Sequence, residues 1–200
     1  MKKLTVIGAF LGSLFALPTL AHDGYPTYQE LKERAIFECP RKSWEKIDEG
    51  IIDTLIAIEK QFDVHGSVRG MVLAAGCLES GFNPKALGDR KFSKDKKTPK
   101  AFGVLQLWKF YEKAYGVDRL NAESSARGWL THIIRMLPKV KKQCKHRTPE
   151  KIWVAAWVTG IRSKKAGGRC NEKPKHLKLL RKWQREIRKA RELPKGNCGC

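Results

Sequence analysis

The sequence predicts a fold made almost entirely of α-helices. Apolar residues recur at three- to four-residue steps in several segments, which is the period of an amphipathic helix. Residues typical of helix ends, such as a capping hydroxyl or a stop glycine, flank these segments. One stretch, residues 83–101, has neither feature and holds glycine, proline and many basic residues. We therefore predict an all-α or α-dominated α+β fold with one small irregular or hairpin-like segment.

Residues 1–21 differ in composition from the rest of the chain. Lys2 and Lys3 precede an apolar run that continues to Leu17, and small residues close the segment at Ala21. This order is typical of a secretory signal peptide. An uncleaved membrane anchor is the alternative, because the apolar run approaches the length that spans a bilayer. We predict cleavage after Ala21, a secreted protein of the periplasm or cell envelope, and no stable membrane span after cleavage.

The mature chain, residues 22–200, is long enough for a single domain with a hydrophobic core. We predict an N-terminal helical extension, and a helix that begins near Ser43 and carries one apolar stripe. The helices predicted beyond the irregular segment run from Val104 to Tyr115, from a cap at Asn121, from the start signal Thr148-Pro149-Glu150, and, with a basic surface, from about Pro174 to Leu193.

A short helix is also predicted from Val68 to about Ser80. Ser67 can cap its start, and Gly81 favours a stop directly after its last turn. Glu79 lies in that last turn, after a run of small apolar residues. A carboxyl group in such surroundings loses hydration, which favours the protonated form that a general acid needs. The alternative interpretation is an ordinary acidic residue near a helix end.

The chain is strongly basic, with 41 Lys and Arg against 20 Asp and Glu and a formal net charge of +21. Such an excess favours a polyanionic partner, which could be nucleic acid, an anionic membrane surface or an anionic cell-wall polymer. Export favours the cell-wall polymer, and we predict no nucleic-acid partner. A secreted cationic protein that binds DNA or anionic membranes is the alternative from a different class.

The cysteine pattern predicts disulfides, because an exported chain with an even number of cysteines forms them readily. We favour a bridge between Cys144 and Cys170, which flank one helix-sized segment, and next a bridge between Cys39 and Cys77. The pairing of Cys198 and Cys200 stays open.

The histidines do not suggest a metal site. His65, His132, His146 and His176 are scattered along the chain without the spacing of metal ligands. We therefore predict no metal and no cofactor, and these residues receive no functional role from the sequence.

Three short motifs resemble those of the soluble lytic transglycosylases, a family within the lysozyme-like superfamily. The first, residues 78–86, reads LESGFNPKA, where the family has a Glu-Ser pair followed by an aromatic residue, Asn-Pro and Ala. The second, residues 103–107, reads GVLQL in place of Gly-Leu-Met-Gln-Leu. The third, residues 156–160, reads AWVTG and matches Ala-Tyr-Asn-x-Gly in part. The three occur in the family's order over roughly residues 65–190.

The resemblance implies a lysozyme-like α fold and cleavage of peptidoglycan glycan strands between N-acetylmuramic acid and N-acetylglucosamine. By matching position, Glu79 would be the catalytic acid and then the base, and Ser80 would help to orient it. Gln106 would hydrogen-bond the sugar amide groups. Trp157 would line the cleft where the family has tyrosine, with Thr159 beside it in substrate binding.

Two alternatives stay open within this reading. A lytic transglycosylase manages with one carboxylate, because the 6-hydroxyl of the muramic sugar attacks and gives a 1,6-anhydro product. A goose-type-like muramidase would instead hydrolyse the same bond with a second carboxylate, for which Asp89 and Asp95 are the candidates. Solvated surface charges are the favoured interpretation of both residues.

The altered third motif raises a further alternative, a non-catalytic cationic cell-wall-binding protein on the same scaffold. Retention of Glu79, Ser80 and Gln106 together favours the enzyme. The sequence leaves open whether such an enzyme serves wall turnover, a secretion or conjugation machine, or a phage.

Overall fold

The computed structural model describes residues 24–39, 47–145, 147–159, 170 and 175–192, and helices dominate these residues. The predicted α-dominated fold is therefore confirmed. The predicted signal peptide, residues 1–21, lies outside the described residues. The α-helices are α1 Tyr28–Glu38, α2 Glu49–Lys60, α3 Met71–Ser80, α4 Lys109–Tyr115, α5 Ala122–Gln143, α6 Pro149–Thr159 and α7 Lys175–Glu192.

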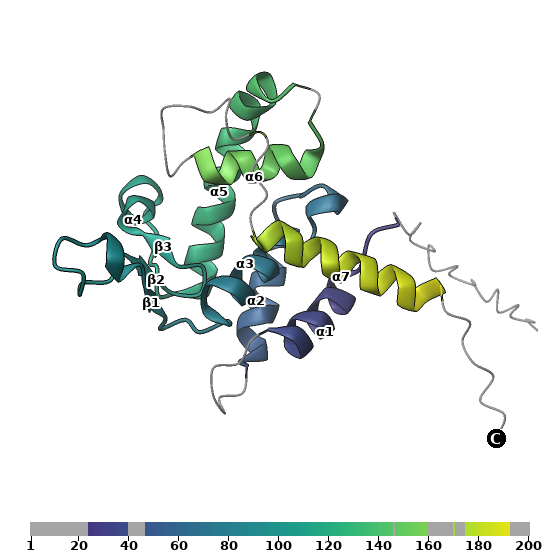
Figure 1. Cartoon of the computed structure of the whole chain (residues 1–200), viewed down its shortest axis with the longest axis horizontal. Coiled ribbons are helices and arrows are strands. Elements are labelled where there is room, and N and C mark those ends of the chain that lie inside the picture. The colour runs from purple at the N-terminus through teal and green to yellow at the C-terminus, as the bar shows by residue number, and fades with distance from the viewer. Residues whose placement is uncertain (1–23, 40–46, 146, 160–169, 171–174, 193–200) are drawn as a thin grey trace, which may run out of the picture.

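Residues 87–108, which include most of the irregular segment, contain a small antiparallel sheet. The described chain also has two short 3-10 turns, one before this sheet and one between its first two strands. Strands β1, β2 and β3 are Leu87–Gly88, Ala101–Phe102 and Leu107–Trp108, in the order β1-β2-β3. The 3-10 turns are η1, Gly66–Val68, and η2, Arg90–Phe92. Figure 1 shows the sheet and α4 together at one end of the molecule. The hairpin-like segment predicted from composition is thus present.

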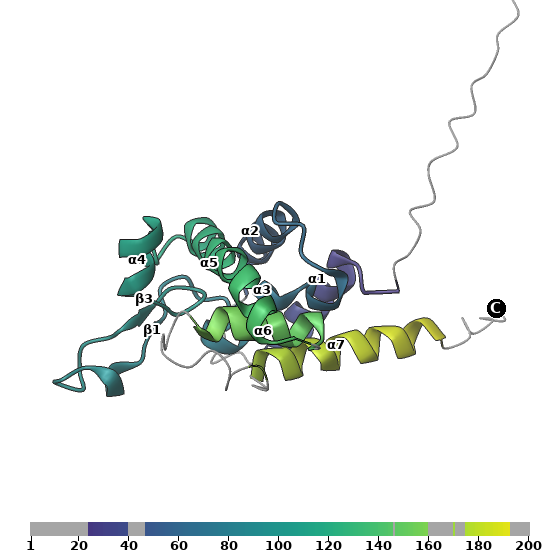
Figure 2. The same ribbon diagram turned by 90° about the horizontal axis from the view of Figure 1, so that it is seen from above.

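Helix α3 lies at the centre of the fold. Every residue from Met71 to Cys77 is buried. Figures 1 and 2 show α7 running along this region beside α1, while α5 packs against α2 and α6. Because small residues such as Ala74, Ala75 and Gly76 occupy α3, its neighbours approach closely and bury the helix on all sides.

The start of α3 differs from the prediction, because Ser67 does not cap it. The N-cap is Gly70, whose φ of 86° suits a residue without a side chain. The capping acceptors come from Glu59 of α2, which receives the Gly70 N–H at 2.6 Å and the Val72 N–H at 3.1 Å. Ser67 instead bonds the His65 ring at 2.8 Å.

Two other predicted helix starts are wrong by several residues. Helix α2 begins at Glu49 instead of near Ser43, because Asp48 caps it by accepting the Gly50 N–H at 2.9 Å. Helix α4 begins at Lys109 instead of Val104, because the chain first makes a tight turn and then β3.

The other predicted helix boundaries are confirmed where the structure describes them. The Asn121 side chain caps α5 by accepting the Ser124 N–H at 2.9 Å, and α6 begins at Pro149. Glycines in the left-handed conformation, Gly81 and Gly116, end α3 and α4. Helix α7 falls within the predicted range, whose end residues lie outside the described part of the chain.

Both favoured disulfides are formed. Cys39 joins Cys77, with Cα atoms 5.3 Å apart, and Cys144 joins Cys170, with Cα atoms 5.5 Å apart. Such bridges are compatible with an exported protein. Cys198 and Cys200 lie outside the described residues. Within the described residues, no helix has both the length and the apolar character needed to cross a membrane.

Candidate active site

The end of α3 places Glu79 at the edge of the core. Two successive residues, Gly81 and Phe82, adopt left-handed φ values of 62° and 65°. Their N–H groups return to the helix, bonding the carbonyls of Cys77 at 3.0 Å and Gly76 at 3.2 Å. The buried Phe82 ring closes over Gly76. This turn stops the helix one residue after Glu79, so the carboxylate lies where the buried helix reaches the surface.

Glu79 is in close contact with a histidine from the other end of the chain. His176, in the first turn of α7, brings its Nε2 to 2.7 Å from Glu79 Oε1. The His176 side chain is mostly buried, whereas that of Glu79 keeps 32 % of its surface exposed. Residues 74–77 therefore lie in the core, whereas Leu78 is exposed and the Glu79 carboxylate is partly exposed, with the His176 imidazole as its partner.

Tryptophans of two other helices support the histidine. The Trp157 ring of α6 meets the His176 ring edge-on, with centroids 4.5 Å apart. Trp129 of α5 packs against Trp157 at 5.5 Å and against Trp153 at 5.6 Å. Edge-to-face aromatic pairs of this kind are stabilising, and they fix the orientation of each ring. Trp157, assigned to the site by resemblance, is thus linked to Glu79 through His176.

Ser80 connects the end of α3 to the second motif. Its hydroxyl donates to the carbonyl of Val104 at 2.8 Å and lies 3.2 Å from the carbonyl of Gly76. The hydroxyl is thus engaged with two backbone carbonyls. Ser80 thereby joins the last turn of α3 to the loop of residues 103–106.

Gln106 braces the hairpin from within. Its side-chain amide donates to the carbonyls of Ala86 at 3.0 Å and Gly103 at 2.9 Å. Its oxygen lies beside Gly88, so close that a Cβ there would be 2.1 Å away. Both described donor contacts of Gln106 are therefore made to the protein's own backbone, and the residue holds β1 and the loop together.

Thr159, also assigned to the site by resemblance, is the last residue of α6. Its side chain lies outside the described part of the structure. The described contacts thus bring Glu79 and Trp157 together through His176, and join Ser80 to the loop that contains Gln106.

The two candidate second carboxylates are each bonded within the hairpin. Asp95 accepts hydrogen bonds from Ser93, Lys97 and Thr98, and these donors, the Ser93 hydroxyl first among them, lower the pKa of its carboxyl group. Asp89 accepts the Trp108 indole N–H at 2.8 Å. Both carboxylates therefore have structural partners.

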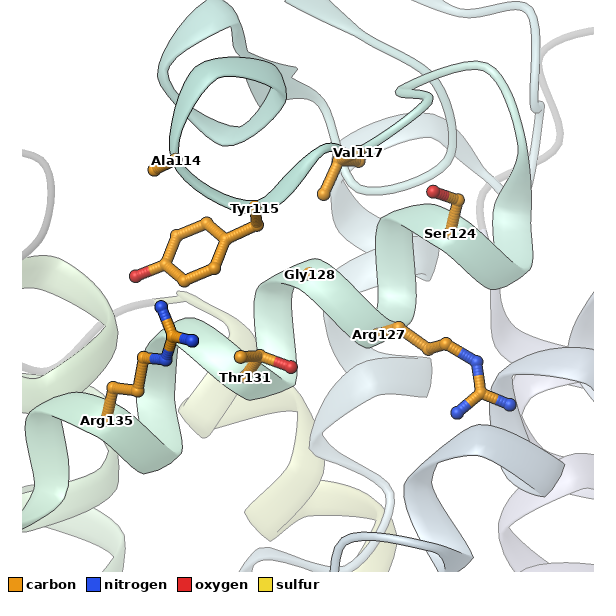
Figure 3. Close-up of a pocket in the computed structure, with 8 residues that line it drawn as sticks. All are labelled: Ala114, Tyr115, Val117, Ser124, Arg127, Gly128, Thr131 and Arg135. Atoms are coloured by element: carbon orange, nitrogen blue, oxygen red, sulfur yellow. The ribbon is translucent and has the colours of Figure 1, made fainter.

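A cavity of about 420 Å³ lies away from these residues, between α4 and α5. Figure 3 shows Tyr115 and Arg135 at one end, Gly128 in the middle, and Ser124 and Arg127 at the other end. Its lining includes none of the residues that the sequence assigns to a site. Within the described residues, no cluster of three or more histidine, cysteine or acidic side chains could hold a metal ion.

His176 is the site residue that sequence reasoning missed. A signal for it was present, because His176 continues the apolar stripe of α7 that contains Leu180, Trp183 and Ile187. A histidine on the buried face of an otherwise basic helix needs a polar partner inside the protein. The partner could not be identified from spacing, since Glu79 lies 97 residues away.

Comparison of the chain with models of known protein families, with characterised proteins and with solved structures finds no match. The arrangement offers one partly exposed carboxyl group, bonded to a buried imidazole that packs against Trp157. Such a carboxyl group can give and take a proton at a bound substrate.

Proposed function

We propose that the protein is a peptidoglycan lytic transglycosylase with Glu79 as its single catalytic acid and base. The observation that carries the proposal is the placement of Glu79. Its carboxylate is partly exposed at the end of a buried helix, and one oxygen is hydrogen-bonded by His176. Within the described residues the second oxygen has no hydrogen-bond partner, so we assign it to the substrate. The motif resemblance supplies the substrate, a glycan strand of alternating N-acetylmuramic acid and N-acetylglucosamine.

In the first half of the reaction, protonated Glu79 gives its proton to the glycosidic oxygen. The bond from that oxygen to C1 of the muramic sugar breaks, and C1 takes on oxocarbenium character. In the second half, the 6-hydroxyl of the same sugar attacks C1, and the Glu79 carboxylate takes the hydroxyl proton. The products are a 1,6-anhydromuramic end and a free 4-hydroxyl group, and Glu79 is protonated again for the next cycle.

Two observations favour this reaction over hydrolysis. A hydrolase of this kind usually needs a second carboxylate to activate water. Asp95 already accepts several hydrogen bonds within its own turn, and Asp89 holds the Trp108 indole. With both occupied in the hairpin, a single-carboxylate mechanism is the better fit.

The chain's charge suits the proposed substrate. Peptidoglycan carries carboxylates on its stem peptides, and a chain with a formal charge of +21 is attracted to such a polymer. The two disulfides suit a location outside the cytoplasm, in the periplasm or cell envelope.

The test is release of soluble fragments from purified peptidoglycan by residues 22–200. Glu79→Gln keeps the shape of the side chain and removes the exchangeable proton, so we expect at least a ~100-fold lower rate. Glu33→Gln is the matched control, since Glu33 is an exposed glutamate on α1, and it should leave the rate unchanged. A folded Glu79→Gln variant that cuts at the wild-type rate would refute the proposal.

A further inference from the structure

The contact between Glu79 and His176 involves one oxygen of the carboxyl group and one nitrogen of the ring. Glu79 Oε1 lies 2.7 Å from His176 Nε2, and Oε2 has no hydrogen bond to the described residues. The two oxygens of Glu79 therefore have different environments. The effect of this asymmetry on proton transfer depends on the proposed role of Glu79 as the catalytic acid and base.

The surroundings of the ring indicate which nitrogen carries the hydrogen. His176 Nδ1 is buried and has no hydrogen-bond partner in the part of the chain that the structure describes. A buried N–H without an acceptor is rarer and costlier than a buried ring nitrogen without a donor. The neutral ring is thus expected to carry its hydrogen on Nε2, where it can donate to Glu79.

We propose that His176 is the positioning residue of Glu79: its Nε2–H donates to Oε1 and confines the exchanged proton to Oε2. When Glu79 is protonated, Oε1 is the carbonyl oxygen and accepts the imidazole hydrogen, so the carboxyl proton lies on Oε2. When Glu79 has given up that proton, the same hydrogen bond becomes charge-assisted and stronger. The bond therefore stabilises the anion formed midway through the reaction, and the proton returns to the same oxygen.

Trp157 packs against the ring, and buried residues hold the start of its helix. Trp157 meets it edge-on at 4.5 Å, and Trp129 in turn packs against Trp157. On its own helix, the neighbouring Leu177 and Leu180 are buried and fix the start of α7 in the core. A ring braced in this way keeps its hydrogen bond through the catalytic cycle at little cost in entropy.

Two substitutions separate the hydrogen bond from the packing. His176→Phe keeps a ring against Trp157 and removes both nitrogens, whereas His176→Gln offers an amide N–H near the position of Nε2. On a soluble glycan oligosaccharide, we expect His176→Phe to lower kcat by about 10-fold or more and to change KM by less than about 2-fold. His176→Gln should recover most of the lost kcat.

A His176→Phe variant with wild-type kcat would overturn the proposal. So would a His176→Gln variant that loses as much kcat as His176→Phe while both stay folded, because a purely structural role would then explain the loss.

A spectroscopic measurement on the wild-type protein tests the proposal without relying on activity. Long-range nitrogen–proton NMR distinguishes the two neutral forms of each histidine, and the signal of His176 is identified by its absence in His176→Phe. We expect the Nε2–H form, and the Nδ1–H form would overturn the proposal. A wild-type protein that cuts no glycan defeats the proposed function, yet this spectrum still decides how the two residues are bonded.

Discussion

Glu59 is a second carboxyl group with an unusual environment, and its role is structural. It is fully buried and accepts N–H groups from Gly70 and Val72, with the Tyr28 hydroxyl 3.3 Å away. Burial raises the pKa of Glu59 to about 7, while these donors act in the opposite direction. Glu59 thus supplies the cap that α3, the helix of Glu79, lacks in its own sequence.

Glu59 makes stability depend on pH. Its folded pKa lies above the ordinary value of 4.5, so the folded state holds the proton more tightly than the unfolded state. The stabilisation is fully present below about pH 4.5 and declines as the pH rises through about 7. Relative to Glu59→Gln, the wild type should lose at most about 3 kcal/mol of unfolding free energy between pH 5 and pH 8.

Urea denaturation of both proteins at these two pH values checks this prediction. Glu33→Gln serves as the control for a change at an exposed glutamate. If the unfolding free energies of the wild type and Glu59→Gln changed equally between the two pH values, Glu59 would not titrate in this range.

At the residue scale, the sequence indicates candidate residues within a local motif, but it does not reveal contacts between residues far apart in the chain. The prediction of Glu79 rests on the residues that follow it in the sequence. The His176 contact spans 97 positions, and the Glu59 cap comes from a neighbouring helix. The resemblance assigns Gln106 to sugar binding, but its described donor contacts are to backbone carbonyls. Those contacts depend on the three-dimensional path of the hairpin, which the sequence motif does not contain.

The loop between β2 and β3 is the element that joins the second motif to α3. Gly103 has a φ of 75°, and a Cβ there would lie 1.7 Å from the carbonyl oxygen of Arg119. Arg119 in turn donates to the carbonyls of Lys100 and Leu107 and stacks on Phe102 at 4.2 Å. Gly103 is therefore packed against backbone that cannot move aside without breaking the hairpin.

Gly103→Ala should cost at least about 3 kcal/mol of unfolding free energy, because a left-handed alanine is combined with a backbone clash. Gly116→Ala is the matched control. Its φ of 64° is similar, but a Cβ there meets nothing within 4 Å, so the cost should be about 1 kcal/mol. Thermal unfolding of the two variants measures the difference. If both variants lost the same unfolding free energy, the contact with Arg119 would not constrain the loop.

At the element scale, a local signal made several helix ends predictable but did not suffice at every start. The start of α2 was missed although Asp48 caps it locally, and the start of α3 depends on Glu59 of another helix. The start of α5 is marked by the Asn121 cap, and the start of α6 by Pro149 at its first position. The start of α4 was placed too early, because Gln106 has a left-handed φ of 49° that apolar periodicity does not reveal. Helix α1 carries a capping box, Thr27 with Glu30, which is a readable signal for the predicted N-terminal extension.

The whole molecule is organised around α3. Buried apolar side chains from every helix that the structure describes form one core. The bridge of Cys39 to Cys77 ties α1 to α3 near Glu79, and Glu30 pairs with Arg191 to hold α1 against α7. Composition and periodicity predicted the α-dominated fold, but they contain no information on which helices become neighbours. The site depends on that arrangement, since its parts come from α3, α6 and α7.

The central claim is that this molecule cuts glycan strands with one carboxyl group, and the products test it most directly. Mass spectrometry of purified peptidoglycan digested by residues 22–200 distinguishes 1,6-anhydromuramic ends from reducing ends, which are heavier by one water. We predict anhydromuramic products from the wild type and none from Glu79→Gln. Reducing ends from the wild type would mean hydrolysis with a second group that activates water, and would contradict the single-carboxylate mechanism.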